Sequence, residues 1–131
     1  MDHRWLGTEW RTIMIAIKYG DIVTVSIGPN SAIESGATVC YAVIISDDIV
    51  NEHLKSVIVC PVIEAKQLLE SRIGATFIPK EKSGMVFDGV VLSLQIKTIS
   101  KDKILERVGS IPAPYTRQLK ESLKAVLALD K

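Results

Sequence analysis

The chain has few of the residues on which several common functions depend. Its 131 residues include only two cysteines and two histidines, and 5% are aromatic. Two cysteines are too few for a disulfide scaffold, and so low an aromatic content disfavours a platform for stacking single-stranded bases. Lys and Arg number 16 against 15 Asp and Glu, for a formal net charge of +1. No overall field therefore attracts nucleic acid or anionic membranes, and any such binding must come from a local patch.

The start of the chain has no targeting or membrane-spanning pattern. Charged residues such as Arg4 and Glu9 run through segment 1–18, which therefore lacks the apolar core of a signal peptide and the length of a membrane span. Cys40 and Cys60 lie inside apolar runs, where a reduced thiol packs like a small hydrophobic side chain. We expect a cytoplasmic protein of one main domain, with no membrane contact.

Hydrophobic periodicity divides the chain into elements. Apolar residues at helical spacing from Trp5 to Ile17 predict a short N-terminal helix. Polar segments 28–37 and 47–55 are interpreted as a surface loop and a connector, and 64–72 as about two helical turns. Alternation or continuous apolar runs predict strands at 22–27, 38–46, 56–63, 76–79, 90–94, 96–99 and 104–111.

The last predicted element is a helix over 115–129. Pro112 and Pro114 end the preceding strand and start the helix, and apolar residues from Tyr115 onward recur on one face. Such a helix is about 22 Å long at 1.5 Å per residue, enough to pack across the sheet of a domain of this size. Many short strands and one terminal helix predict a mainly β fold of the α+β class, a small barrel with helices outside it.

No motif for nucleophilic catalysis, metal binding or nucleotide hydrolysis stands out. Neither His3 nor His53 belongs to a recognisable triad, and Gly28-Pro29-Asn30 is not followed by the Gly-Lys-Ser/Thr of a phosphate-binding loop. His53 and the carboxylates at 47, 48 and 52 form a solvated turn or, as the functional alternative, a cation site. The solvated turn is the preferred interpretation, so we expect no metal and no cofactor.

Basic residues recur over segment 97–107, where Asp102 and Glu106 dilute them. The ordinary interpretation is a solvated face, and the functional alternative is an edge that contacts phosphates. The basic residues are Lys97, Lys101, Lys103 and Arg107.

The order of short segments along the chain is more informative than any one of them. In sequence they are Gly20-Asp21-Ile22-Val23, Ala42-Val43-Ile44-Ile45-Ser46-Asp47-Asp48, Val57-Ile58-Val59-Cys60-Pro61, Gly89-Val90-Val91-Leu92, Gln95-Ile96-Lys97-Thr98-Ile99 and Arg107-Val108-Gly109. This ordered set resembles the MazF/PemK family of toxins from toxin-antitoxin systems. The resemblance defines 20–131 as a toxin-like domain and 1–19 as an N-terminal helical extension.

The resemblance implies an SH3-like barrel with a long C-terminal helix, assembled as a homodimer. It also implies a metal-independent endoribonuclease that cuts single-stranded RNA, inhibits growth and is neutralised by a cognate antitoxin. Toxins of the CcdB type, which poison gyrase, share this architecture. The fold alone therefore does not fix the target.

The groups that family members use for cleavage are replaced in this chain. The family usually has an Arg-Pro pair at the start of the second strand, where Val39 or Cys40 stands here. It usually has a Thr or Ser two residues after the Pro of the third strand, where this chain has Ile63, followed by Glu64. Because losing one preorganised donor typically costs roughly a hundred- to a thousandfold in turnover, the resemblance implies a degenerate ribonuclease site.

Substitute groups define the candidate site. Glu64 or His53 is the candidate base, and Lys97 is the candidate for stabilising charge on the phosphate. Groups that remain able to hydrogen-bond RNA are Glu34, Ser93, Gln95, Lys97 and Lys101.

Two other interpretations remain open. The first is a non-catalytic toxin-fold module that binds an antitoxin peptide, DNA or gyrase through an apolar patch. The second is an unrelated small barrel, which predicts a monomer. The residues of the apolar patch would be Val39, Cys40, Ile63, Leu92 and Leu94.

Overall fold

The computed structural model describes residues 16–27, 38–67 and 73–131. Most of the predicted N-terminal helix, the loop that contains Glu34 and the second half of the predicted 64–72 helix lie outside these residues. The described part of the N-terminal extension, residues 16–19, has no helix or strand, and Ile17 is buried in the core.

Within the described ranges seven strands and two α-helices follow one another, with three short 3-10 turns between them. The strands are β1 (Asp21–Ile27), β2 (Thr38–Ile44), β3 (Ser56–Glu64), β4 (Ala75–Ile78), β5 (Gly89–Leu92), β6 (Lys97–Ser100) and β7 (Ile104–Ser110). The helices are α2 (Asp48–His53) and α3 (Ala113–Leu127), and the 3-10 turns are η1 (Ala65–Gln67), η2 (Ser93–Gln95) and η3 (Lys101–Lys103).

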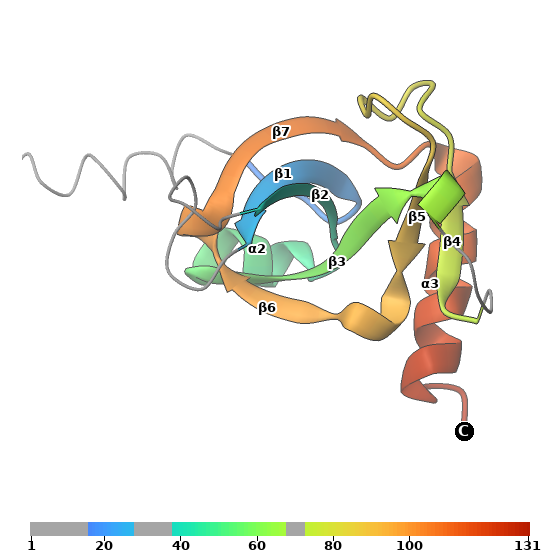
Figure 1. Cartoon of the computed structure of the whole chain (residues 1–131). Helices are drawn as coiled ribbons and strands as arrows, with labels where there is room; N and C mark the ends of the chain where they lie inside the picture. Colours follow the sequence, from blue (N-terminus) through green and yellow to red (C-terminus); the bar gives the residue numbers. More distant parts are fainter. Residues whose placement is uncertain (1–15, 28–37, 68–72) are drawn as a thin grey trace, which may run out of the picture.

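The strands form one strongly curled antiparallel sheet. Its order is β4-β5-β3-β2-β1-β7, and β6 pairs with the first half of β3. In Figure 1 the strands β1, β2, β3, β6 and β7 curve around a common interior, while β4, β5 and α3 lie to one side. Because no ladder joins β6 to β7 among the described residues, the sheet is barrel-like and not fully closed. The predicted α+β, SH3-like architecture with a long C-terminal helix is confirmed in this sense.

Two hydrophobic clusters occupy opposite faces of the sheet. Ala42 and Ile44 belong to one cluster and Val43 to the other, because successive side chains of a strand alternate between faces. This explains why the central strands are continuous apolar runs. The inner cluster contains Ile17, Val23, Val25, Ala42, Ile44, Val57, Val59 and Ile104. The helix-side cluster contains Ile22, Val43, Cys60, Val62, Ile78, Met85, Val91, Ile111 and Leu119.

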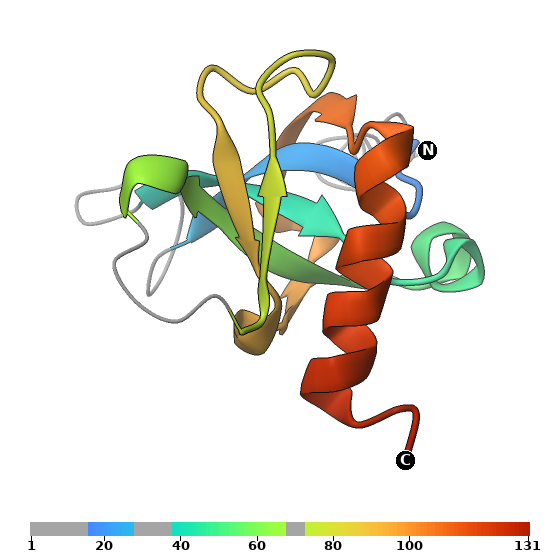
Figure 2. The same cartoon turned by 90° about the vertical axis from the view of Figure 1, so that its right-hand side faces the viewer.

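Helix α3 covers the helix-side cluster and packs beside β4 (Figure 2). Leu119 is fully buried, and Tyr115 and Leu123 pack against the same cluster. The helix ends at Ala128, whose left-handed backbone (φ 56°) returns its N–H to the carbonyls of Lys124 and Ala125. The predicted helix is therefore confirmed, displaced by two residues toward the N-terminus.

A buried ion pair joins the first and last segments of the family-like set. Asp21 Oδ2 accepts from the Lys18 backbone N–H at 2.8 Å and lies 3.1 Å from Arg107 Nε. The Asp21 side chain is buried while the Arg107 side chain is half exposed. The pair ties the start of β1 to β7, which is the strand beside it in the sheet.

Segment 48–53 forms a helix where the sequence suggested only a connector. Asp47 caps its start by accepting from the Ile49 N–H at 2.9 Å. Asn51 is buried, and its side chain bonds to the hydroxyl and the carbonyl of Ser46. Lys101 donates from Nζ to the Asn51 carbonyl. Six residues are too few to show helical periodicity, so α2 is recognisable only from its cap and these long-range contacts.

Loop 79–88 crosses β7 at a point where two glycines allow the backbones to touch. A Cβ on Gly84 would lie 2.0 Å from the Val108 carbonyl oxygen, and a Cβ on Gly109 would lie 2.0 Å from that of Ser83. No side chain fits there without moving a backbone. The crossing holds the middle of this loop, which also supplies Phe87 to the site described below.

We expect Gly109→Ala to lower the free energy of unfolding by about 3 kcal/mol, because the new methyl group must displace loop 79–88. Gly20→Ala is the matched control: Gly20 has φ 88° but nothing within 4 Å of an added Cβ. Its free energy of unfolding should fall by only about 1 kcal/mol, which is the cost of a left-handed backbone at a residue with a Cβ. Urea titrations followed by circular dichroism measure both, and equal losses would contradict the close approach.

Candidate functional site

A pocket opens where β2 and β3 separate. Their pairing runs from Ile44↔Val59 to Tyr41↔Val62 and stops there. From Val62 onward β3 pairs with β5 on its opposite edge, while residues 38–40 continue to pair with β1 on their other side. In the described part of the chain no strand lies against the second edge of 38–40. Alternate main-chain groups of this edge therefore face the opening between β2 and β3, which we call the fork.

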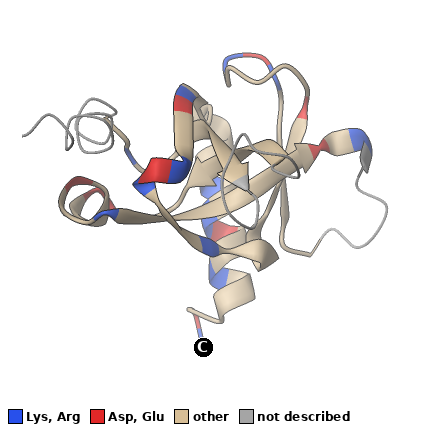
Figure 3. Cartoon of the chain, turned by 60° about the vertical axis from the view of Figure 1, so that its left-hand side comes forward, with Lys and Arg blue, Asp and Glu red and all other residues tan. Residues whose placement is uncertain are grey.

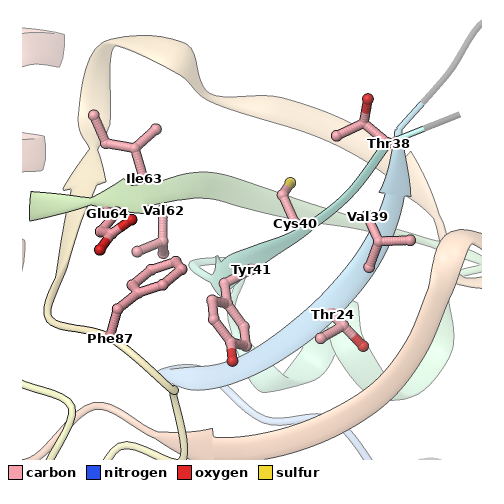
Figure 4. A pocket seen from close by; sticks show the side chains of 9 residues that line it. All are labelled: Thr24, Thr38, Val39, Cys40, Tyr41, Val62, Ile63, Glu64 and Phe87. Atoms are coloured by element: carbon pink, nitrogen blue, oxygen red, sulfur yellow. The ribbon is translucent and has the colours of Figure 1, made fainter. Parts of the chain in front are cut away.

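The fork encloses a cavity of about 560 Å³, a size typical of small-ligand sites. We call it the fork pocket (Figure 4). Its described lining comes from β1, β2, β3 and loop 79–88, and consists of Thr24, Thr38, Val39, Cys40, Tyr41, Val62, Ile63, Glu64 and Phe87.

Strand alternation gives the pocket two sides. Val39, Tyr41 and Val62 point to the same side of the sheet as Phe87, whereas Thr38, Cys40 and Ile63 point to the other (Figure 4). The first side is an extension of the helix-side cluster, to which Val62 and Tyr41 also belong. The pocket is thus an uncovered end of the core, reached through the gap between the strands.

Two aromatic rings form one wall. The rings of Tyr41 and Phe87 meet edge to face, with centroids 5.3 Å apart and an interplanar angle of 76°. The Val86 backbone N–H donates to the Tyr41 hydroxyl at 3.1 Å. Loop 79–88 is therefore held in its middle by the glycine crossing on β7 and near its C-terminal end by Tyr41 on β2.

Glu64 is the one acidic or basic residue among the described lining. Its side chain is 32% exposed, and its Oε2 lies 3.5 Å from Nζ of Lys66, which is 77% exposed. A second hollow of about 440 Å³ adjoins the fork pocket, shares Glu64 and Phe87 with it, and contains Lys66 and Lys80. A carboxylate therefore separates an apolar pocket from a hollow with two lysines.

The structure does not bring the three predicted catalytic residues together. His53 ends α2, is exposed, and has its Nδ1 2.9 Å from the Ile49 carbonyl. Glu64 ends β3, whose other end, Ser56, lies next to α2. Nine residues of strand separate these ends by about 26 Å at 3.3 Å per residue. His53 and Glu64 cannot serve one substrate bond together.

Lys97 lies on the opposite face of the sheet from Glu64. It pairs with Val59, which belongs to the inner cluster, whereas Glu64 shares its strand face with Cys60 and Val62 of the helix-side cluster. Lys97 is exposed. Burial raises the pKa of the Cys40 thiol, and the positive charge of Lys97 lowers that pKa by a smaller amount. Lys97 does not line the fork pocket.

The predicted RNA-binding residues are distributed over several surfaces. Ser93 is fully buried and its hydroxyl accepts from that of Ser122 at 3.0 Å. Lys101 is buried against α2, and burial lowers the pKa of its ammonium. Gln95 is exposed on η2, and Glu34 lies outside the described residues. We do not carry Ser93 and Lys101 into the proposed site, because both side chains are engaged in packing.

The predicted apolar patch is also divided. Val39, Cys40 and Ile63 line the fork pocket. Leu94 is 68% exposed and lies with Val126 beside Gly74, next to α3. Sequence reasoning missed Thr24, Tyr41 and Phe87, and only Phe87, one of the few aromatic residues and placed in a polar loop, gave a signal.

Charge is mixed over the rest of the molecule. Figure 3 shows basic and acidic residues side by side in the loops and helices, with the central strands largely uncharged. Among the described residues no group of three or more His, Cys, Asp or Glu side chains is placed to hold a metal ion. No helix in the same residues has the length and hydrophobicity needed to cross a membrane.

Comparisons with known proteins agree with this architecture. Residues 18–127 match the family of PemK-like, MazF-like toxins of type II toxin-antitoxin systems. Since the match spans most of the chain, the fold and sequence define a toxin of a toxin-antitoxin system. The chain belongs to the PemK/MazF family.

Individual relatives and similar solved structures come from mycobacteria and from Deinococcus radiodurans. Endoribonuclease MazF2 of Mycobacterium bovis and endoribonuclease MazF6 of Mycobacterium tuberculosis are each 29% identical over 115 residues, which is 88% of this chain and 100% of the relative. A mycobacterial endoribonuclease solved with its cognate antitoxin has a TM-score of 0.70 at 18% identity, covering 87% of this chain and 97% of that one. The toxin in a MazE-MazF crystal structure from Deinococcus radiodurans has a TM-score of 0.68 at 18% identity, covering 86% and 97%.

The two thiols should differ in reactivity. Cys60 is fully buried, and burial raises its pKa to about 11, so it has almost no thiolate near neutral pH. Cys40 is partly exposed at the pocket. We expect a disulfide reagent to modify Cys40 slowly in the native protein, Cys60 only after denaturation, and Cys40→Ser to abolish the native reaction. Equal native reactivity in Cys40→Ser and Cys60→Ser would contradict the burial of Cys60.

Proposed function

We propose that this toxin binds single-stranded RNA in the fork pocket and has a degenerate cleavage site. The observation that carries the proposal is that two positions of the family's site meet in one pocket. The usual Arg position is Val39 or Cys40 here, the usual Thr or Ser position is Ile63, and all three residues line the fork pocket. The relatives that are named endoribonucleases span nearly the whole chain, which supports RNA as the target.

The chemistry of the lining favours binding over cleavage. Strand scission by the 2′-hydroxyl needs a base, an acid and positive charge or strong donors around the phosphorane. Glu64 is the only predicted catalytic residue in the pocket, and the described lining has no cation. A lone carboxylate can take a proton but raises the energy of an anionic transition state. Turnover should therefore be slow.

RNA binding should depend on the open side of the pocket. Val39 is 51% exposed, so Val39→Asp should leave the fold intact while placing a charge at the fork, and should weaken binding to a labelled single-stranded RNA about tenfold or more. Ile49→Asp is the control, since Ile49 is a 70% exposed hydrophobic residue on α2. Fluorescence polarisation measures both.

The same preparations test cleavage of chimeric RNA/DNA oligonucleotides. We expect turnover at least about a hundredfold below that of a relative that retains the arginine. Robust cutting that is lost in Glu64→Ala or Lys97→Ala would contradict the degenerate site. Equal binding by wild type and Val39→Asp would contradict RNA binding at the fork.

We further propose a homodimer that is cytoplasmic and neutralised by a cognate antitoxin, with 20–131 as the toxin domain. Similar toxin folds have been solved with antitoxins, and the edge of 38–40 that no described strand covers offers main-chain groups to an extended protein segment. An antitoxin that covers this edge would exclude RNA from the same pocket.

Expression of the toxin alone should arrest bacterial growth, and co-expression of its short neighbouring gene product should relieve the arrest. In the purified complex we expect slower hydrogen exchange at the amides of 38–40, with α3 amides as the internal control. Light scattering should give the mass of two toxin chains. Unchanged exchange at 38–40 would place the antitoxin elsewhere.

A further inference from the structure

We infer that the fork pocket is a base-reading subsite that selects guanine, with Glu64 as the group that recognises it. The inference rests on the proposed function, because it names the part of single-stranded RNA that enters the pocket. It assigns a specificity role to a residue that the sequence suggested as a general base.

The charge of the pocket decides which part of a nucleotide can enter. Its described lining contains the Glu64 carboxylate and no lysine, arginine or histidine. Placing a phosphate there would bring two negative charges together in a partly desolvated space, which is unfavourable. A nucleobase is neutral, and its flat apolar faces suit the wall formed by Tyr41 and Phe87.

The carboxylate then discriminates between bases. Guanine presents two adjacent donors, N1–H and the N2 amino group, which match the two oxygens of a carboxylate in a bidentate pair. Adenine and cytosine present one amino group on this edge, and uracil presents one N3–H, so each leaves one carboxylate oxygen without a partner. Only guanine satisfies Glu64 fully.

The contact that Glu64 makes in the structure is one that a base can replace. Lys66 Nζ lies 3.5 Å from Glu64 Oε2, and the Lys66 side chain is 77% exposed. An exposed pair of this kind contributes little to stability. When a base hydrogen-bonds to the Glu64 carboxylate, the Lys66 ammonium is released toward the solvent next to the bound base.

The adjoining hollow offers basic side chains to the phosphate of the same nucleotide. It contains Lys66 and Lys80 and shares Glu64 and Phe87 with the fork pocket. The second acidic residue of this hollow, Asp88, already accepts from the Lys80 backbone N–H at 2.9 Å. A nucleotide with its base in the fork pocket would therefore place its phosphate near two cations, across the carboxylate that holds the base.

The test compares uridine oligonucleotides that carry a single central guanosine, inosine, adenosine or cytidine. Inosine keeps N1–H but lacks the N2 amino group, so it removes one of the two hydrogen bonds and nothing else. We expect the wild-type toxin to bind the guanosine oligonucleotide about tenfold or more tightly than the others. Fluorescence polarisation at fixed low salt gives the four affinities.

Glu64→Gln should abolish the preference, because its amide presents an NH₂ group where guanine also presents donors. Glu121→Gln is the matched control: Glu121 is an exposed glutamate with a lysine partner, Lys124, at 3.7 Å on α3. It should keep the wild-type preference. If Glu64→Gln does not fold, the wild-type comparison of guanosine with inosine still decides the matter.

The outcomes separate the inference from the proposed function. Equal affinity for the four oligonucleotides, or a guanosine preference that persists in Glu64→Gln, would overturn guanine reading while leaving RNA binding intact. Failure to bind any of them would overturn both. A loss of preference confined to Glu64→Gln supports the assignment.

Discussion

Strand β3 changes partners along its length, and the rest of the structure depends on this change. Its first half pairs with β6, its middle with β2, and its end with β5. One strand therefore joins the curled part of the sheet to the β4–β5 pair beneath α3. On the opposite edge of β3, the pairing with β2 ends at Tyr41 and Val62. The fork pocket follows from this separation, since a sheet that kept its pairing to the end of both strands would leave no opening.

The polarity of the pocket determines what it can do. In a desolvated site a few fixed charges dominate the chemistry, and the described lining of this site has one carboxylate, that of Glu64, and no lysine, arginine or histidine. Hydrophobic side chains at 39 and 63 add apolar surface. The protein thus combines the fold of RNA-cleaving toxins with a lining better suited to holding a neutral, donor-bearing group than to stabilising a phosphorane.

The loop that completes the pocket is held by contacts distant in sequence. Its backbone at Gly84 touches β7 at Gly109, and near its end Phe87 packs edge to face with Tyr41. On the other side of the sheet, the short helix α2 is fixed by Asn51 and by Lys101 from η3. The two ends of β3 are therefore both rigidly supported, and the pocket is largely preformed.

The sequence by itself determined the pattern of strands, the terminal helix and the family, because these depend on local periodicity and on the order of segments; it missed the six-residue helix α2. It also singled out Val39, Cys40, Ile63 and Glu64, which the structure places in one pocket. It did not determine that His53 and Lys97 lie away from Glu64, that Ser93 and Lys101 are buried, or that Tyr41 and Phe87 form the wall. Those facts depend on which strands pair and on which face each side chain lies. Such long-range pairing is decided by the packing of the whole sheet, so only the tertiary structure assembles the site.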